Sequence, residues 1–148
     1  MHHVAMAFDV ERLLNLWTDP LPEGAAAEDA FRELYTDPVT VNGTSLSAAE
    51  MVTRARALQG SFEHPQREIL GLTEGEGSVA VAFRLTGRHV GPLNTSVGVL
   101  PPTGKVIALR VIDILTIEDD LISEIVMVAD ELGGIAAIGA ARLTSPAG

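Results

Sequence analysis

The sequence contains no cysteine, which excludes a disulfide framework, a thiol nucleophile and a thiolate metal site. Aromatic residues make up only 4% of the chain, which argues against the stacking platforms that bind single-stranded nucleic acid. No apolar run is long enough to span a bilayer. Basic residues are also scarce: 10 Lys and Arg stand against 20 Asp and Glu, for a formal net charge of −10. Because this charge repels phosphates and anionic lipids, we expect neither nucleic acid nor a membrane as partner.

The length of 148 residues and the hydrophobic content of 47% favour one domain with a substantial core. We expect it to span residues 1–148, with flexible tails at 1–3 and at about 143–148. No apolar signal segment follows the start Met1-His2-His3, so we expect a cytoplasmic protein.

Apolar residues at helical spacing predict helices over residues 4–17, 25–35 and 48–60, the third opened by a Ser47–Glu50 capping box. A short strand is expected over 39–42. From residue 66 onward the pattern becomes that of strands, and four are expected at 67–72, 78–86, 106–117 and 121–129, with a loop over 87–104 and a short helix after residue 130. Helices on one face of a curved antiparallel sheet make an α+β fold.

The last two of these strands carry apolar residues on both faces. In the strand over 121–129, Val126 and Val128 share a face with Asp130, while Ile125 and Met127 fill the other. A strand with one solvated face would alternate apolar and polar residues. We therefore expect helices to cover one face of this hairpin and a second subunit to cover the other.

Five short motifs follow one another over residues 85–133: LTGRHVG at 85–91, PPTGK at 101–105, VIDI at 111–114, ISE at 122–124 and DELG at 130–133. In this order and spacing they resemble the SnoaL-like polyketide cyclases, a branch of the NTF2-like superfamily. The resemblance implies a cone-shaped barrel, commonly a homodimer, with helices packed on the concave side of a curved antiparallel sheet.

The same resemblance implies intramolecular aldol ring closure on a hydrophobic polyketide-type substrate of antibiotic biosynthesis or other secondary metabolism, without cofactor or metal. The acid/base of the family corresponds to Asp130, and a pocket asparagine corresponds to Asn42. A polar pair of the cyclases falls on Ile114 and Thr116. Since this leaves fewer donors for an oxyanion, ring closure promoted by pocket shape is an alternative.

Three residues are the catalytic candidates. Asp130, directly before a helix, is either an N-cap with a lowered pKa or an acid in an apolar pocket with a raised one, and the resemblance favours the acid. Asp113 lies alone in an apolar run near Arg110, so it needs an ion pair or belongs to the site. His89 lies where a strand ends, and a histidine there is more often solvated than catalytic, but its place in a family motif makes it a candidate near the pocket mouth.

Trp17 and Tyr35 end the first two predicted helices, where an aromatic ring belongs to the core but offers a polar handle. The predicted substrate-binding residues are Trp17, Tyr35, Asn42, Thr116 and Val128. Apart from His2-His3, no histidine pair has ligand spacing, so no metal site is expected.

Three functions remain open at this point. The leading hypothesis is a cofactor-independent polyketide cyclase. The second is a hydrolase or isomerase of a small hydrophobic ligand, in the manner of an epoxide hydrolase, with Arg110, Asp113 and Asp130 around a water. The third is a ligand-binding module without catalysis, because one fold can host many roles.

Overall fold

The computed structural model describes residues 8–146. Three helices precede the long strands, and two of them have side-chain caps. Asp9 accepts from the Arg12 N–H at 3.0 Å, and Ser47 and Glu50 form the predicted capping box. The helices are α1 (Val10–Thr18), α2 (Ala25–Arg32), α3 (Ala48–Ser61) and the short α4 (Glu131–Ala137). None of the helices within residues 8–146 is long and apolar enough to cross a membrane.

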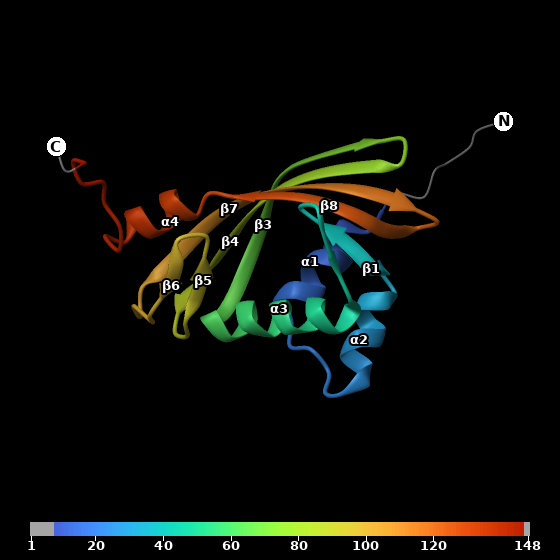
Figure 1. The fold of residues 1–148 in the computed structure, drawn as a ribbon, viewed down its shortest axis with the longest axis horizontal. Coiled ribbons are helices and arrows are strands. Elements are labelled where there is room, and N and C mark those ends of the chain that lie inside the picture. The colour runs from blue at the N-terminus through green and yellow to red at the C-terminus, as the bar shows by residue number, and fades with distance from the viewer. Residues whose placement is uncertain (1–7, 147–148) are drawn as a thin grey trace.

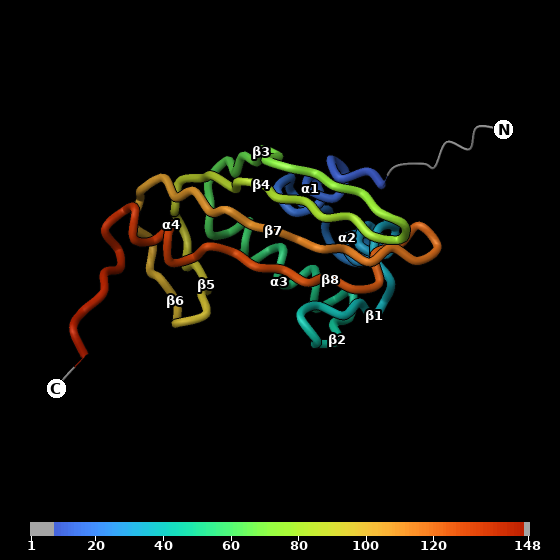
Figure 2. Tube along the Cα trace, turned by 90° about the horizontal axis from the view of Figure 1, so that it is seen from above, coloured from blue at the N-terminus to red at the C-terminus, as the bar shows by residue number. Residues whose placement is uncertain are grey.

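Six strands form one curved sheet in the order β2-β1-β8-β7-β4-β3 (Figures 1 and 2). Its four long strands are the predicted antiparallel meander, whereas β1 lies between the edge strand β2 and β8 and runs parallel to β8. The bounds are β1 (Tyr35–Val41), β2 (Thr44–Leu46), β3 (Phe62–Gly75), β4 (Ser78–His89), β7 (Val106–Glu118) and β8 (Leu121–Ala129). The α+β fold with helices on one side of a curved sheet is confirmed.

Three boundary predictions are wrong. Tyr35 begins β1 instead of ending a helix, because its ring packs into the core as part of a strand that adds to β8. The predicted loop over 87–104 contains a small hairpin, β5 (Leu93–Thr95) and β6 (Gly98–Leu100). The first helix begins at Val10, and residues 4–7 of its predicted range, like the predicted tail at 1–3, lie outside the described residues.

The β5–β6 hairpin is fixed at both of its ends. Before it, the Gly91 N–H donates to the Ser61 carbonyl, and a Cβ on Gly91 would lie only 2.1 Å from the Gly60 carbonyl oxygen. At its tip, the Ser96 N–H and hydroxyl donate to Glu131 Oε1 at 3.0 and 2.6 Å. The hairpin therefore stands between the end of α3 and the start of α4.

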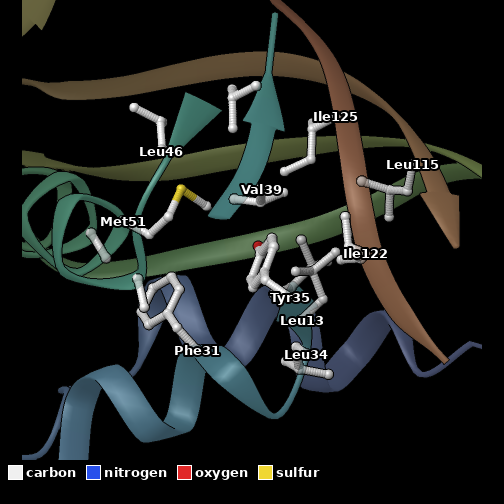
Figure 3. Packing of buried hydrophobic residues seen from close by; sticks show 14 of the residues in the cluster. Leu13, Phe31, Leu34, Tyr35, Val39, Leu46, Met51, Leu115, Ile122 and Ile125 are labelled. Carbon is white, nitrogen blue, oxygen red and sulfur yellow. The ribbon is translucent and has the colours of Figure 1, made fainter. Parts of the chain in front are cut away.

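The hydrophobic core divides into two clusters. The larger joins α1, α2 and α3 to β1 and the nearby parts of the sheet, and Figure 3 shows Tyr35 inside it, between Phe31 of α2 and Ile122 and Ile125 of β8. The smaller cluster contains Phe62, Leu85, Leu93, Ile107 and Leu109. Both clusters lie on the concave side of the sheet.

The opposite, outer face of the sheet is also apolar. Alternate residues of β7 and β8 point there, and Ile112, Ile114, Val126 and Val128 are 47–67% exposed. Within residues 8–146, no helix covers these side chains (Figure 1).

Candidate functional site

A cavity of about 220 Å³ lies between the helices and the concave face of the sheet. Its wall takes residues from both core clusters and is mainly apolar, with Leu14, Met51, Phe83, Leu109 and Ile125 among the lining side chains. An enclosed apolar cavity with a few polar groups is the usual form of a small-molecule site. The polar groups in this wall therefore decide what the cavity can do.

Asp113 is a carboxylate that lines this cavity. It lies on β7 with Val111 and Leu115 on the concave face, opposite Val81 in β4 and Met127 in β8. Its Oδ1 is buried and has no hydrogen-bond partner among the described residues, and burial raises the pKa of Asp113 from 3.8 to about 6. A carboxyl group with this pKa can both take and return a proton near neutral pH.

Tyr35 and Trp17 also line the cavity and hold each other in place. Trp17 Nε1 donates to Tyr35 Oη at 2.8 Å. Burial raises the pKa of Tyr35 above its usual range, the bond from Trp17 opposes this rise, and the charge of Asp113 adds to it. The phenol therefore stays protonated, and its own hydrogen can be donated to a second acceptor.

Arg67 and Glu131 are polar residues of the wall that the sequence did not single out. Arg67, on β3, donates from Nη2 to Glu11 Oε2 at 2.6 Å and to Asn15 Oδ1 in α1. The strand β3 carries two register shifts against β4, so its sequence does not reveal which residues face inward. Arg67 could only be recognised from the folded chain.

Asp130 does not lie in the cavity, so its predicted position in an apolar pocket is wrong. It is the N-cap of α4, where Oδ1 accepts from the Gly133 N–H at 2.9 Å, and Oδ2 lies 3.2 Å from Arg110 Nη2 on the outer face. These two bonds hold the pKa of Asp130 below its usual value, and the side chain is 43% exposed. The hollow around it is open and polar, with Arg84 and Arg110 in its wall.

Asn42 is also outside the cavity wall. Its side chain accepts from the Met127 N–H at 2.8 Å and donates to the Met127 carbonyl at 3.2 Å, so it ties the end of β1 to β8. An exposed asparagine with a positive φ of 48° ends a strand in this way without contacting a ligand in the cavity. The expected pocket asparagine is therefore corrected to a structural link between strands.

His89 is fully buried instead of lying at a pocket mouth. Its Nδ1 accepts from the Thr103 N–H at 3.2 Å, its ring packs near Phe62, and it does not line the cavity. The loop that precedes β7 covers the ring, which the strand pattern alone did not reveal.

The matching family model decides the classification. A family model described as SnoaL-like polyketide cyclase matches residues 11–138 of the chain. The chain belongs to this family. The SnoaL-like resemblance read from residues 85–133 is therefore confirmed.

Solved structures agree in fold with this SnoaL-like chain. TsrD from Streptomyces laurentii has a TM-score of 0.73 at 19% identity, over 89% of this chain and 92% of TsrD. A SnoaL-like polyketide cyclase from Agrobacterium tumefaciens has 0.68 at 15%, over 87% and 92%. AclR, a candidate hydroxylase from Streptomyces galilaeus, has 0.65 at 19%, over 93% and 100%. Among curated proteins, none matches the chain.

The remaining predicted site residues of this SnoaL-like chain face away from its cavity. Thr116 does not line it, and Val128 is 67% exposed on the outer face. Arg110 and Asp130 pair on the outer face, whereas Asp113 faces the cavity. The hydrolase network expected from Arg110, Asp113 and Asp130 is thus divided by the sheet and is not assembled.

Proposed function

We propose that this chain is a cofactor-independent cyclase of a polyketide-type small molecule in secondary metabolism, and that it works in the cytoplasm as a homodimer. In this proposal Asp113, and not Asp130, moves the proton. The observation that carries it is the Asp113 carboxyl group, which lines an apolar cavity with one buried oxygen unpartnered and a pKa of about 6. Membership of the SnoaL-like polyketide cyclases supports the reaction class.

The proposed reaction needs one base and one hydrogen-bond donor. Asp113 removes a proton from a carbon flanked by two carbonyl groups, and the resulting carbanion, delocalised over the substrate, attacks another carbonyl carbon. The new C–C bond leaves an alkoxide, to which Tyr35 Oη, held by Trp17, can donate. Asp113 then returns its proton to the product. The cavity itself contributes by folding a flexible chain into a reactive conformation.

Product mass tests this reaction directly. A linear substrate with several β-carbonyl groups is incubated with the purified chain, and the product is analysed by mass spectrometry in water enriched in oxygen-18. Ring closure by aldol addition gives an isomer of the substrate with no solvent oxygen in a new bond. A product that gains one water and carries oxygen-18 would instead identify a hydrolase.

Asp130 provides the matched comparison for Asp113. Asn keeps the ability to cap a helix, so Asp130→Asn is expected to retain nearly normal turnover and only a slightly lowered melting temperature. Both are measured on the same preparation, by the cyclisation assay and by thermal unfolding. Loss of turnover in a folded Asp130→Asn variant would return Asp130 to the mechanism and contradict the proposal.

A ligand-binding module without catalysis is the second candidate, and the capping role of Asp130 favours it because this carboxylate is engaged in structure. The two candidates share the cavity and differ in turnover. Binding of a β-carbonyl substrate without any change in its mass, connectivity or proton exchange would support the binding module.

The homodimer is proposed from the outer face of the sheet. Four exposed apolar side chains of β7 and β8, namely Ile112, Ile114, Val126 and Val128, gather there, and a patch of this kind is typical of a protein interface. A second copy offers the same apolar surface, so the two faces can cover each other about a two-fold axis.

We expect Ile114→Asp to convert a dimer into a monomer, because it would place two carboxylates in the interface. Light scattering coupled to size-exclusion chromatography measures the mass. Val99→Asp is the control, since Val99 is 61% exposed on β6, away from this face. A monomeric wild type, or a dimer that survives Ile114→Asp, would contradict the proposed interface.

A further inference from the structure

Two buried polar atoms of the cavity-lining residues have no partner among the described residues. One is the acceptor Oδ1 of Asp113 and the other is the donor Nε of Arg67. A third such atom, Nε2 of His89, belongs to a residue outside the cavity wall. Buried polar groups are nearly always hydrogen-bonded, so a donor and an acceptor left open in one cavity indicate that a ligand completes them.

Arg67 is held so that only part of its guanidinium is engaged. Nη2 is bound by Glu11 and Asn15 of α1, which fixes the plane of the group, while the Nε–H remains available. The side chain is 23% exposed, so it is mostly enclosed by the protein. An immobilised donor of this kind loses little conformational freedom when a ligand binds.

The charge around Arg67 favours a neutral acceptor over an anion. Glu11 Oε2 lies 2.6 Å from Nη2 and offsets the positive charge. Asp113 adds a negative charge to the wall once it is ionised. The other charged side chains of the wall, Arg54 and Glu131, are exposed or partly exposed and therefore screened by solvent. A carboxylate would meet the charge of Asp113 with only the exposed, solvent-screened Arg54 as an unpaired cation in the described wall, whereas a ketone or ester oxygen carries no charge to balance.

The two open atoms belong to distant positions of the sheet. Asp113 on β7 pairs with Val81 of β4, and Arg67 on β3 pairs with Leu85 of the same strand. Four residues separate these positions, roughly 13 Å along the strand at ~3.3 Å per residue. A ligand that reaches both must carry its acceptor far from the carbon that faces Asp113.

We propose that Arg67 is a specificity-determining residue whose Nε–H binds a neutral carbonyl oxygen of the substrate, remote from the carbon that reacts at Asp113. The substrate class is an uncharged, carbonyl-bearing compound with an apolar body, and Glu11 sets this preference by neutralising Arg67. The inference extends the proposed function, but it concerns binding and does not require turnover.

Three matched probes test it without a known substrate. They share one skeleton: 4-phenyl-2-butanone is a neutral ketone, 3-phenylpropionate is its isosteric carboxylate, and butylbenzene is the hydrocarbon. Trp17, the single tryptophan of the chain, lines the cavity and reports binding by its fluorescence. The wild type is expected to bind the ketone roughly tenfold more tightly than either other probe, as a hydrogen bond to a charged donor allows.

Two substitutions test whether Arg67, and not the general polarity of the cavity, causes the preference for the ketone. Arg67→Met is expected to abolish the preference for the ketone over butylbenzene and to leave butylbenzene binding intact. Glu11→Gln, a mild change on an exposed helix position, leaves the Arg67 charge free and is expected to shift the ketone-to-carboxylate ratio about tenfold towards 3-phenylpropionate. A ketone preference that survives in Arg67→Met, or a ratio unchanged in Glu11→Gln, would overturn the inference.

The same measurements in Asp113→Asn distinguish this inference from the proposed function. If Asp113 is not the catalytic group, Asp113→Asn turns over as fast as the wild type, while the ketone preference of Arg67 remains. If Arg67 does not read the carbonyl, the preference is absent although Asp113 still governs turnover. Circular dichroism of each variant establishes that it is folded before binding is compared.

Discussion

Asn in place of Asp113 is expected to reduce turnover by a factor of about 10²–10⁴, the usual contribution of a positioned general base. The amide keeps the size of the carboxyl group but can neither accept nor return the proton. In the wild type, kcat/KM is expected to rise with pH through about 6, because the base acts when Asp113 is ionised. The residual kcat/KM of the Asn variant should not show this rise with pH through about 6.

The same substitution is expected to stabilise the fold at neutral pH. The pKa of Asp113 is raised in the folded chain from 3.8 to about 6, so the folded state binds this proton more tightly than the unfolded chain. The contribution of Asp113 to the stability of the wild type is therefore most favourable below pH 3.8. The free energy of unfolding falls as the pH rises from there through about 6. A shift of roughly two units corresponds to about 3 kcal/mol at neutral pH, which the Asn variant should recover in part.

Urea unfolding of both proteins at several pH values measures this difference. The gain of the Asn variant should be present at neutral pH and should disappear in acid, where Asp113 of the wild type is protonated. An Asn variant that is inactive and also less stable at neutral pH would indicate a structural carboxylate with a partner. A variant that turns over normally would remove Asp113 from the mechanism.

Phe31→Ala is expected to lower the free energy of unfolding by about 3–5 kcal/mol, the usual effect of deleting a fully buried aromatic ring. Phe31 is 0% exposed, stacks on Tyr35 at a centroid distance of 5.6 Å and meets Trp17 edge-on at the same distance. It therefore packs against both aromatic rings that line the cavity, and Figure 3 shows it beside one of them, Tyr35. Its loss leaves a void beneath the only described hydrogen bond between them.

Equilibrium unfolding in urea measures this loss, with Leu143→Ala as the control because Leu143 is 90% exposed. The control is expected to change stability by less than about 0.5 kcal/mol. Turnover of Phe31→Ala under conditions where it is folded should also fall, since Tyr35 loses its packing. A small change in stability would mean that the neighbouring side chains close the void.

Much of the fold could be predicted from local patterns. The capping box at Ser47 and Glu50 and the apolar strands of the meander each carry their own signal, and the structure agrees with them. Tyr35 was misplaced because an aromatic residue after a helical pattern gives no sign that β8, far along the chain, pairs with it. The β5–β6 hairpin was missed because two strands of three residues are too short for a period to show.

The choice of carboxylate could have been made from the sequence. Strand residues alternate between faces, and Asp130 continues the row of Val126 and Val128, which is the outer row in the structure. Asp113 shares its row with Leu115, which is buried. The family motif at residues 130–133 favoured Asp130 over this alternation. Arg67 had no such signal, because its role depends on Glu11 and Asn15, more than fifty residues away.

Because the core is divided into two clusters, we expect a bound ligand to stabilise the chain. The cavity is lined by residues of both clusters and interrupts the packing between them, so the ligand-free chain has a gap in its core. A ligand that fills this gap contacts both clusters and links their packing. The ligand-bound protein should therefore have a higher melting temperature and less local opening than the ligand-free protein. The difference should grow with the concentration of the ligand.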